Sequence, residues 1–263
     1  MNISYQNRTC LVTGSARGIG KACAKKFAEN GADVILVDVN KEVVEQSAIE
    51  IANEYNCKTW AYTVDLSDLN SCEALMEDIH SDIGTVDVLA NCAGITVSKR
   101  LIEVTPQEWD KVSDINLKSI WYLSQLFAKQ LIASDKKEGN IVSISSQASK
   151  IGEYGNGTYS VSKAGVNSLT QVLGVELAEH GISVTAICPG YVNTEMVQDV
   201  FQKRAPLEGM TPEEYAKTLT STVPMNRMSE PEEVADLMAY LAGGNANYIT
   251  GVTVTIAGGK TLI

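Results

Sequence analysis

The run Thr13-Gly14-Ser15-Ala16-Arg17-Gly18-Ile19-Gly20 decides the fold, because it joins a short apolar segment to a long amphipathic one. Residues 9–13 in front of it have the composition of a buried strand, and residues 18–30 behind it have apolar positions at helical spacing. Glycines at such a junction let the backbone approach a phosphate, and the first turn of the helix offers free N–H groups. An ordinary glycine-rich turn has a similar composition, but this placement favours dinucleotide binding. The candidate contacts are Gly14, Ser15, Arg17, Gly18, Ile19 and Gly20.

The same alternation of short β-rich runs and longer amphipathic runs continues along the chain. The expected strands are residues 33–37, 58–64, 86–90, 140–144, 183–187 and 251–256. The expected helices are residues 41–55, 68–83, 106–131, 158–180 and 231–241. This order predicts an α/β fold with a doubly wound, mostly parallel sheet of the Rossmann type.

A single domain is expected from residue 1 to residue 263, since no linker, repeat or low-complexity tract divides the chain. Between residues 190 and 227 the alternation gives way to Pro, Gly, Thr and charged residues, with a short helix expected at 212–219. A long excursion of this kind in a compact domain usually covers a site. We therefore expect residues 190–227 to cover the substrate.

The composition narrows the functional classes. The formal net charge of −11 is unfavourable for binding nucleic acid or an anionic membrane. No apolar run approaches the roughly 20 residues that span a bilayer, and the first residues lack a signal-peptide pattern. The six cysteines form no CxxC or Cys/His cluster, which predicts reduced thiols and no metal site. A cytoplasmic protein with a small-molecule substrate is expected.

Asp38 closes the expected second strand, where a carboxylate accepts hydrogen bonds from an adenosine ribose. A 2′-phosphate there would be repelled by at most about 4 kcal/mol, for two unit charges about 4 Å apart at an effective dielectric near 20. NAD is therefore expected rather than NADP. Arg17 leaves two possibilities open, because its guanidinium could pair with a phosphate or neutralise Asp38. Asp65 and Leu66 are placed to bind the adenine, although an Asp at a strand end can simply cap the next turn.

Tyr159 and Lys163 pair a phenol with an ammonium four residues apart on an expected helix, so their side chains share one face. A tyrosine hydroxyl has a pKa of about 10 and exchanges protons poorly at neutral pH unless a nearby cation stabilises the phenolate. Lys163 is placed to be that cation. The same pair occurs by chance on many exposed helices. It indicates a catalytic site only in combination with the segments at 13–20, 91–94 and 145–146.

Together these segments resemble the short-chain dehydrogenase/reductase family over nearly the whole chain. The resemblance rests on residues 13–20, Asn91-Cys92-Ala93-Gly94, Asn116, Ser146, Tyr159-x-x-x-Lys163, Pro189-Gly190 with Thr194, Arg227 before Pro231-Glu232-Glu233-Val234-Ala235, Tyr248-Ile249-Thr250-Gly251 and Gly258-Gly259. It implies four catalytic residues: Tyr159 as general acid and base, Ser146 on the substrate oxygen, Lys163 on the nicotinamide ribose and Asn116 on a relay water. Ser145 is the fallback for Ser146. It also implies cofactor contacts at Asn91, Ala93, Gly94, Tyr159, Lys163, Pro189, Gly190, Val192 and Thr194.

The resemblance implies hydride transfer between NAD(H) and a secondary alcohol or ketone. Lys163 and a positively charged nicotinamide are both expected to lower the pKa of Tyr159. A cofactor-binding regulator without catalysis and a purely structural subunit are the alternatives, and the complete catalytic set argues against both. A homotetramer is also implied, with residues 106–131 and 158–180 at one interface and the C-terminal segment at another. Ordinary core packing predicts the same apolar faces on these helices.

The stretch Ser146-Gln147-Ala148 followed by Gly152-Glu153 gives the hint about the substrate. It looks like the corresponding stretch in the family's sorbitol- and galactitol-type polyol dehydrogenases. Gln147, Glu153 and Asn156 would hydrogen-bond a hydroxyl-rich ligand, whereas an acyl chain prefers an apolar lining. A polyol or sugar is therefore expected, unless these side chains simply face water. The alternative is a 3-oxoacyl thioester (acyl-carrier-protein) reductase, because residues 190–227 also contain several apolar side chains.

Overall fold

A parallel β-sheet forms the centre of the structure, a computed structural model that describes residues 3–136 and 138–262. In this part of the chain the sheet has seven strands in the order β3-β2-β1-β4-β5-β6-β7. The strands are β1 (Thr9–Thr13), β2 (Asp33–Asp38), β3 (Thr59–Thr63), β4 (Val88–Asn91), β5 (Gly139–Ile144), β6 (Ile182–Pro189) and β7 (Val252–Ile256). The expected single-domain Rossmann-type fold is confirmed; Met1, Asn2, Lys137 and Ile263 lie outside the described residues.

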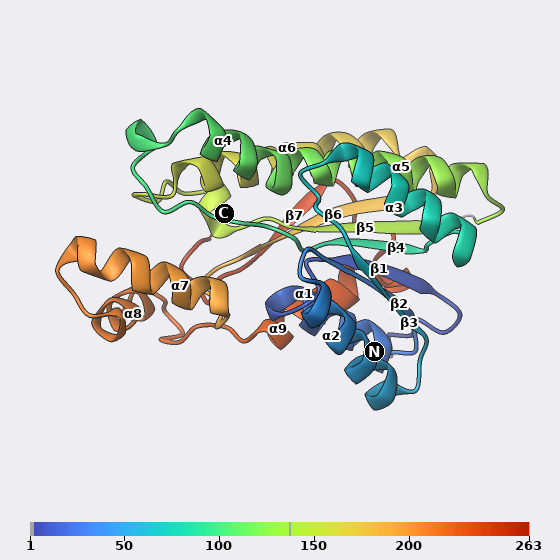
Figure 1. The fold of residues 1–263 in the computed structure, drawn as a ribbon, viewed down its shortest axis with the longest axis horizontal. Helices are drawn as coiled ribbons and strands as arrows, with labels where there is room; N and C mark the ends of the chain where they lie inside the picture. The colour runs from blue at the N-terminus through green and yellow to red at the C-terminus, as the bar shows by residue number, and fades with distance from the viewer. Residues whose placement is uncertain (1–2, 137, 263) are drawn as a thin grey trace.

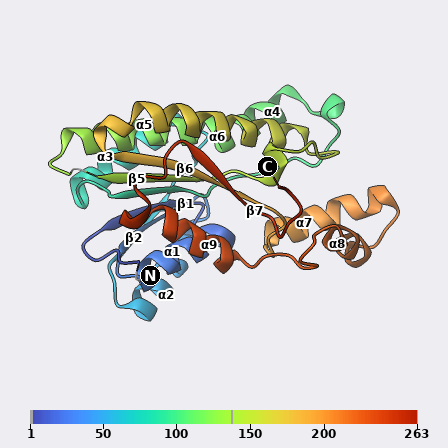
Figure 2. The same cartoon turned by 180° about the vertical axis from the view of Figure 1, so that it is seen from behind.

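Helices cover both faces of the sheet (Figure 1). One face carries α1 (Gly18–Glu29), α2 (Lys41–Tyr55) and α9 (Pro231–Leu241), and the opposite face carries α3 (Leu69–Asp82), α4 (Pro106–Ser113), α5 (Ser119–Ala133) and α6 (Gly157–Glu176). Figure 2 shows the same two layers from behind. The remaining helices, α7 (Glu195–Arg204) and α8 (Pro212–Ser221), project to one side of this sandwich. They belong to the long excursion that the sequence predicts.

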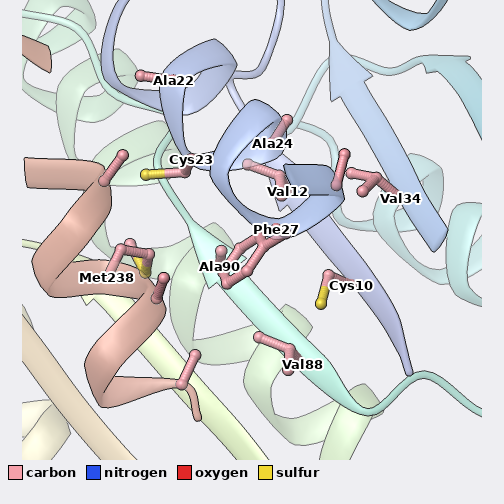
Figure 3. Close-up of a cluster of buried hydrophobic side chains, with 14 of the residues drawn as sticks. Cys10, Val12, Ala22, Cys23, Ala24, Phe27, Val34, Val88, Ala90 and Met238 are labelled. Atoms are coloured by element: carbon pink, nitrogen blue, oxygen red, sulfur yellow. The ribbon is translucent and has the colours of Figure 1, made fainter. Parts of the chain in front are cut away.

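Successive residues of a strand point to opposite faces of the sheet, and both sets are apolar in β1, so both faces must be covered. On β1, Cys10 and Val12 pack into one buried cluster, while Leu11 packs into the cluster on the other face. Phe27 of α1 fills the first cluster together with Met238 of α9 (Figure 3). Burying a side chain of this size contributes about 1.5–3 kcal/mol. The inner strands β4, β5 and β6 are therefore buried along their whole length, whereas the edge strands β3 and β7 are only partly buried.

The sheet reverses its winding between β1 and β4, and this reversal places the candidate site. Thr13 at the end of β1 pairs in register with Asn91 at the end of β4. Open α/β sheets bind ligands beside the carboxyl ends of strands at such a switch point. The glycine-rich turn after β1 and the segment after β4 therefore lie side by side at this edge of the sheet. We call the region beside these two segments the crevice.

Three expectations about the elements need correction. The expected helix 106–131 is interrupted by a π turn at Asp114–Lys118. The expected helix 158–180 ends at Glu176 and is followed by a separate 3-10 turn, Ala178–His180. The segment 190–227 contains α7 in addition to the expected helix near 212–219, and Thr194 caps α7 by accepting a hydrogen bond from the Val197 N–H.

Among the described residues, no helix is both long enough and apolar enough to cross a membrane.

Candidate active site

The glycine-rich turn after β1 has no room for side chains at two of its glycines. Gly14 has a φ of +64°, and a Cβ there would lie 2.6 Å from the Ala93 Cα. A Cβ on Gly20 would lie 2.1 Å from the Gly14 carbonyl oxygen. Arg17 precedes α1 without a side-chain cap, so the first N–H groups of this helix are left for another acceptor. A turn of this shape at a helix N-terminus fits a dinucleotide phosphate.

Asp38 lies at the end of β2, next to this turn. One of its carboxylate oxygens accepts a hydrogen bond of 3.1 Å from the Ala16 N–H, and the other accepts one of 3.1 Å from Asn40. These two bonds fix the Asp38 carboxylate at the end of β2, where the sequence predicts an adenosine ribose. Arg17 forms an exposed ion pair with Glu195 of α7, a partner that was not predicted from the sequence. Its pairing with a cofactor phosphate stays a prediction.

Asp65 caps its own turn, as the second interpretation of this residue predicts. Its carboxylate accepts hydrogen bonds from both the N–H (2.9 Å) and the hydroxyl (2.7 Å) of Ser67. These bonds hold the pKa of the Asp65 carboxyl below its usual value. Leu66 is buried in the core cluster between the sheet and α3. The contact of Asp65 and Leu66 with the adenine stays a prediction.

The segment after β4 is tied to the glycine-rich turn. The N–H groups of Cys92 and Ala93 both donate to the Thr13 hydroxyl, at 3.2 and 3.3 Å. Asn91 is buried and donates to Ser143, while its own side-chain oxygen has no protein partner. A buried acceptor without a partner is rare and suggests a water or ligand group at this place. Gly94 comes shortly after Asn91 and lies next to the side chains of Asn116 and Lys163.

The predicted contacts after β6 lie on the same side of the sheet. Gly190 donates to the Ile256 carbonyl at 2.8 Å, and Val192 is buried. The Thr194 hydroxyl caps α7, and its methyl carbon would lie 3.5 Å from a Cβ on Gly18. Thr194 therefore lies beside the glycine-rich turn, and Pro189, Gly190 and Val192 lead to it from the end of β6.

Tyr159 and Ser146 lie next to each other beyond the end of β5. Tyr159, on the first turn of α6, hydrogen-bonds the Ser146 side chain, which follows β5. Burial raises the pKa of Tyr159 to about 12, while the hydrogen bond from Ser146 lowers it in part. Ser145 points away, because its hydroxyl donates to the Lys163 carbonyl at 3.0 Å. Of the two serines, Ser146 is therefore the one beside Tyr159.

Lys163 lies one helical turn beyond Tyr159 and is almost completely buried. Its ammonium donates a hydrogen bond of 2.6 Å to the Ile144 carbonyl and lies 5.6 Å from the centre of the Tyr159 ring. Burial lowers the pKa of Lys163 to about 8. The expected lowering of the Tyr159 pKa by Lys163 is absent from this structure, since desolvation of the phenolate outweighs the other contributions.

Asn116 occupies the middle of the π turn and is completely buried. Its side chain pairs with the backbone of Ile95, accepting from the N–H at 2.8 Å and donating to the carbonyl at 2.9 Å. A Cβ on Gly94 would lie 3.5 Å from both the Asn116 oxygen and the Lys163 ammonium. The four predicted catalytic residues therefore gather around one point beside Gly94. The π turn itself was not predicted from the sequence.

The three predicted substrate residues form one hydrogen-bonded chain. Gln147 donates to Glu153 at 3.2 Å, and Asn156 donates to the other Glu153 oxygen at 2.9 Å. Asn156 in turn accepts from the Thr96 hydroxyl at 3.0 Å. The interpretation that these side chains simply face water is wrong for Gln147 and Asn156, which are 2% and 7% exposed.

Tyr191 belongs to the same wall and was missed in the sequence. Its hydroxyl hydrogen-bonds Gln147, and burial raises the pKa of Tyr191 to about 12. The available signal was its position directly after Pro189-Gly190, where the chain leaves β6 and enters the crevice.

The fold and the site together indicate the class of protein, a Rossmann-type enzyme. Its site places a phenol, a hydroxyl, an ammonium and an amide, from Tyr159, Ser146, Lys163 and Asn116, beside a turn that fits a dinucleotide. A family model described as Enoyl-(Acyl carrier protein) reductase matches residues 14–261. Over 257 residues the chain is 34% identical to the 3-oxoacyl-(acyl-carrier-protein) reductase FabG of Thermotoga maritima, covering 98% of this chain and 99% of that one.

Solved structures agree with this match. A short-chain type dehydrogenase/reductase from Mycobacterium marinum is 27% identical with a TM-score of 0.90, covering 99% of this chain and 98% of that one. A structure from Beutenbergia cavernae, described as a candidate NAD(P)-dependent gluconate 5-dehydrogenase, is 33% identical with a TM-score of 0.89, covering 99% of both chains. The protein belongs to the short-chain dehydrogenase/reductase family. It is an oxidoreductase that acts on CH–OH groups with a nicotinamide cofactor.

Proposed function

We propose that the enzyme transfers a hydride between NAD(H) and a hydroxyl-rich substrate, a polyol or a sugar. The observation that carries this proposal is the hydrogen-bonded chain of Gln147, Glu153 and Asn156, in which Gln147 and Asn156 are buried and Glu153 is partly exposed. Buried polar groups are costly unless they are paired, so a wall of this kind favours ligands that offer hydroxyl groups to it. The gluconate 5-dehydrogenase description of the Beutenbergia cavernae structure supports the same substrate class.

The nicotinamide supplies or accepts the hydride when it is bound. In the oxidative direction, Tyr159 as phenolate removes the proton of the substrate alcohol. Ser146 donates a hydrogen bond to the same substrate oxygen and keeps it next to the Tyr159 hydroxyl. Lys163 holds the nicotinamide ribose, and Asn116 fixes the backbone at Ile95 and a relay water.

The residues proposed to hold the cofactor come from four segments, which follow β1, β3, β4 and β6. Gly14, Ser15, Gly18, Ile19 and Gly20 offer backbone contacts to the phosphates. Asn91, Ala93, Gly94, Leu66 and Asp65 line the adenosine side, and Pro189, Gly190, Val192 and Thr194 line the nicotinamide side. Asp38 favours NAD, because its carboxylate is fixed beside Ala16 and would repel a 2′-phosphate. We propose that residues 190–227, with α7 and α8, cover the substrate.

A 3-oxoacyl thioester reductase is the second candidate. The similarity to FabG over nearly the full length of both chains favours it. The covering segment also has an apolar interior of its own, in which Phe201 and Tyr215 stack edge to face at 5.9 Å. The polar wall and Asp38 favour the polyol with NAD over this candidate.

We also propose a homotetramer in the cytoplasm. Trp121, Val172 and Val175 are 41%, 50% and 78% exposed on α5 and α6, and large exposed apolar side chains on neighbouring helices favour contact with a second copy. All six cysteines are free thiols, which suits a reducing compartment.

The test is the formation of NADH and, separately, NADPH over a panel of polyols, sugars, sugar acids, simple secondary alcohols and 3-hydroxyacyl thioesters. Turnover of a polyol or sugar with NAD at a kcat/KM at least tenfold above that for thioesters is expected. Turnover only of a thioester with NADP would reject both the substrate class and the cofactor preference and would favour the second candidate.

A further inference from the structure

The C-terminal segment, residues 257–262, turns back over the covering segment after β7. Gly258 and Gly259 have φ values of +59° and +87°, which other residues adopt only with strain. A Cβ on Gly258 would lie 2.7 Å from a Val223 methyl carbon, and one on Gly259 would lie 3.1 Å from Pro224. The Gly258 carbonyl accepts a hydrogen bond of 3.1 Å from Met225. The C-terminal segment is therefore packed closely on the end of the covering segment.

This turn brings two polar side chains to the back of the substrate wall. The Lys260 ammonium lies 5.0 Å from the centre of the Tyr191 ring and also donates to the Thr222 hydroxyl. The Thr261 hydroxyl lies 3.4 Å from the Gln147 side-chain oxygen. Thr261 is 6% exposed, whereas its neighbour Leu262 is 87% exposed. The two residues thus face opposite directions, Thr261 into the protein and Leu262 into solvent.

Tyr191 has space on one side of its ring, so its position depends on these contacts. A cavity of about 50 Å³ is lined by Tyr191, by Val223 and Met225 of the covering segment, and by Ala257 and Gly258. A void of this size gives a side chain room to shift, because it supplies no close packing on that side. Lys260 on the ring and Gln147 on the hydroxyl are the groups that oppose such a shift.

We propose that the C-terminal segment determines substrate specificity, with Thr261 and Lys260 acting as positioning residues that hold Gln147 and Tyr191 toward the substrate. The hydroxyl-rich nature of that substrate rests on the proposed function, but the positioning itself does not. Thr261 donates to the side-chain oxygen of Gln147, which in turn donates to Glu153 and hydrogen-bonds the Tyr191 hydroxyl. Neither Thr261 nor Lys260 exchanges a proton with the substrate.

The test compares Thr261→Val, which removes the hydroxyl at nearly constant volume, with Thr261→Ser, which keeps it. Thr261→Val should raise KM for the polyol about tenfold, the effect of losing about one hydrogen bond, while kcat changes less than twofold. Thr261→Ser should restore KM to within about threefold. Leu262→Ala is the matched control and should leave KM, kcat and the melting temperature unchanged.

A second measurement does not depend on turnover. Hydrogen exchange of peptides containing Gln147 and Tyr191 should become faster in Thr261→Val and in Lys260→Met, but not in Leu262→Ala. If the wild type turns over no polyol, the proposed function fails, and the same variants are then compared on the substrate that is turned over. An unchanged KM together with unchanged exchange in both Thr261→Val and Lys260→Met would overturn the inference, whatever the substrate.

Discussion

The Lys163 ammonium and the Tyr159 ring centre lie 5.6 Å apart in a crevice that favours the neutral form of both groups. Burial raises the pKa of Tyr159 to about 12 and lowers that of Lys163 to about 8. Lys163 directs its ammonium to the Ile144 carbonyl, away from the phenol oxygen. Ionisation of Tyr159 near neutral pH therefore requires a further positive charge beside the phenol.

Replacing Tyr159 by Phe should abolish turnover. The ring would remain, but the hydroxyl that exchanges the proton would be lost, and such a group usually accounts for a factor of about 10²–10⁴ in rate. NAD affinity, measured by fluorescence titration, should change less than threefold. Tyr154→Phe is the control, since Tyr154 is 75% exposed in the loop before α6 and should keep wild-type activity. Turnover near the wild-type rate in Tyr159→Phe would reject the mechanism.

The buried Lys163 should make stability depend on pH in a defined window. An unfolded lysine has a pKa of about 10.4, and the folded one titrates at about 8, so between these values the unfolded chain binds more protons. The free energy of unfolding of the wild type should therefore rise with pH across this window, by up to about 1.4 kcal/mol per pH unit, relative to Lys163→Met. Urea unfolding of the cofactor-free proteins at pH 7, 8, 9 and 10 measures it. Parallel curves for the two proteins would show that Lys163 is not held in a desolvated position.

Removing the charge of Asp38 should weaken the preference for NAD. Asp38→Asn keeps an oxygen that can accept from the Ala16 N–H, but no longer repels a 2′-phosphate. The ratio of kcat/KM for NAD to that for NADP should fall at least about tenfold, which corresponds to about 1.4 kcal/mol. Glu195→Gln is a useful partner variant, because it frees Arg17 from its ion pair and should lower KM for NADP while leaving that for NAD unchanged. A ratio unaltered in Asp38→Asn would remove Asp38 from cofactor selection.

Asn116 should matter for stability as well as for activity. Asn116→Ala removes both hydrogen bonds to the partly buried Ile95 backbone and the 3.1 Å bond that Asn116 donates to the Ser162 hydroxyl. We expect a loss of about 2–4 kcal/mol in the free energy of unfolding. Asn53→Ala, at an exposed position of α2, should change it by less than about 0.5 kcal/mol. Equal small effects in the two variants would mean that the π turn does not depend on the Asn116 side chain.

Sequence patterns predicted the sheet and the catalytic cluster well, because both depend on local signals. Lys41–Tyr55 is a helix with the expected bounds, since Asn40 caps its first turn and the apolar spacing is regular. Tyr159 and Lys163 share a face of α6 simply because they are one turn apart. Helix α7 was missed even though Thr194 caps it, because four apolar residues at helical spacing stand among loop-like neighbours.

Contacts between side chains of distant segments could not be predicted from such local patterns. Nothing in the sequence around Arg17 indicates that its partner is Glu195, which lies 178 residues away. The contact between Thr261 and Gln147 spans 114 residues and depends on the turn at Gly258 and Gly259. The desolvation that raises the pKa of Tyr159 was likewise not visible in the sequence, because it depends on what surrounds the group and not on its neighbours in sequence.

The π turn at Asp114–Lys118 makes one stretch of this chain tolerant of a shorter length. A π turn holds one residue more than an α-helical turn, and each residue rotates a helix by about 100°. Deleting one residue inside this turn would restore a regular helix and leave the phase of α5 unchanged, so that Leu123, Phe127 and Leu131 would stay in the core cluster they now fill. Deleting one residue inside α5 itself would instead rotate the residues after it out of that cluster. A deletion scan of the gene should therefore yield folded protein for single deletions in the π turn, at residues other than Asn116, and not for deletions in the middle of α5.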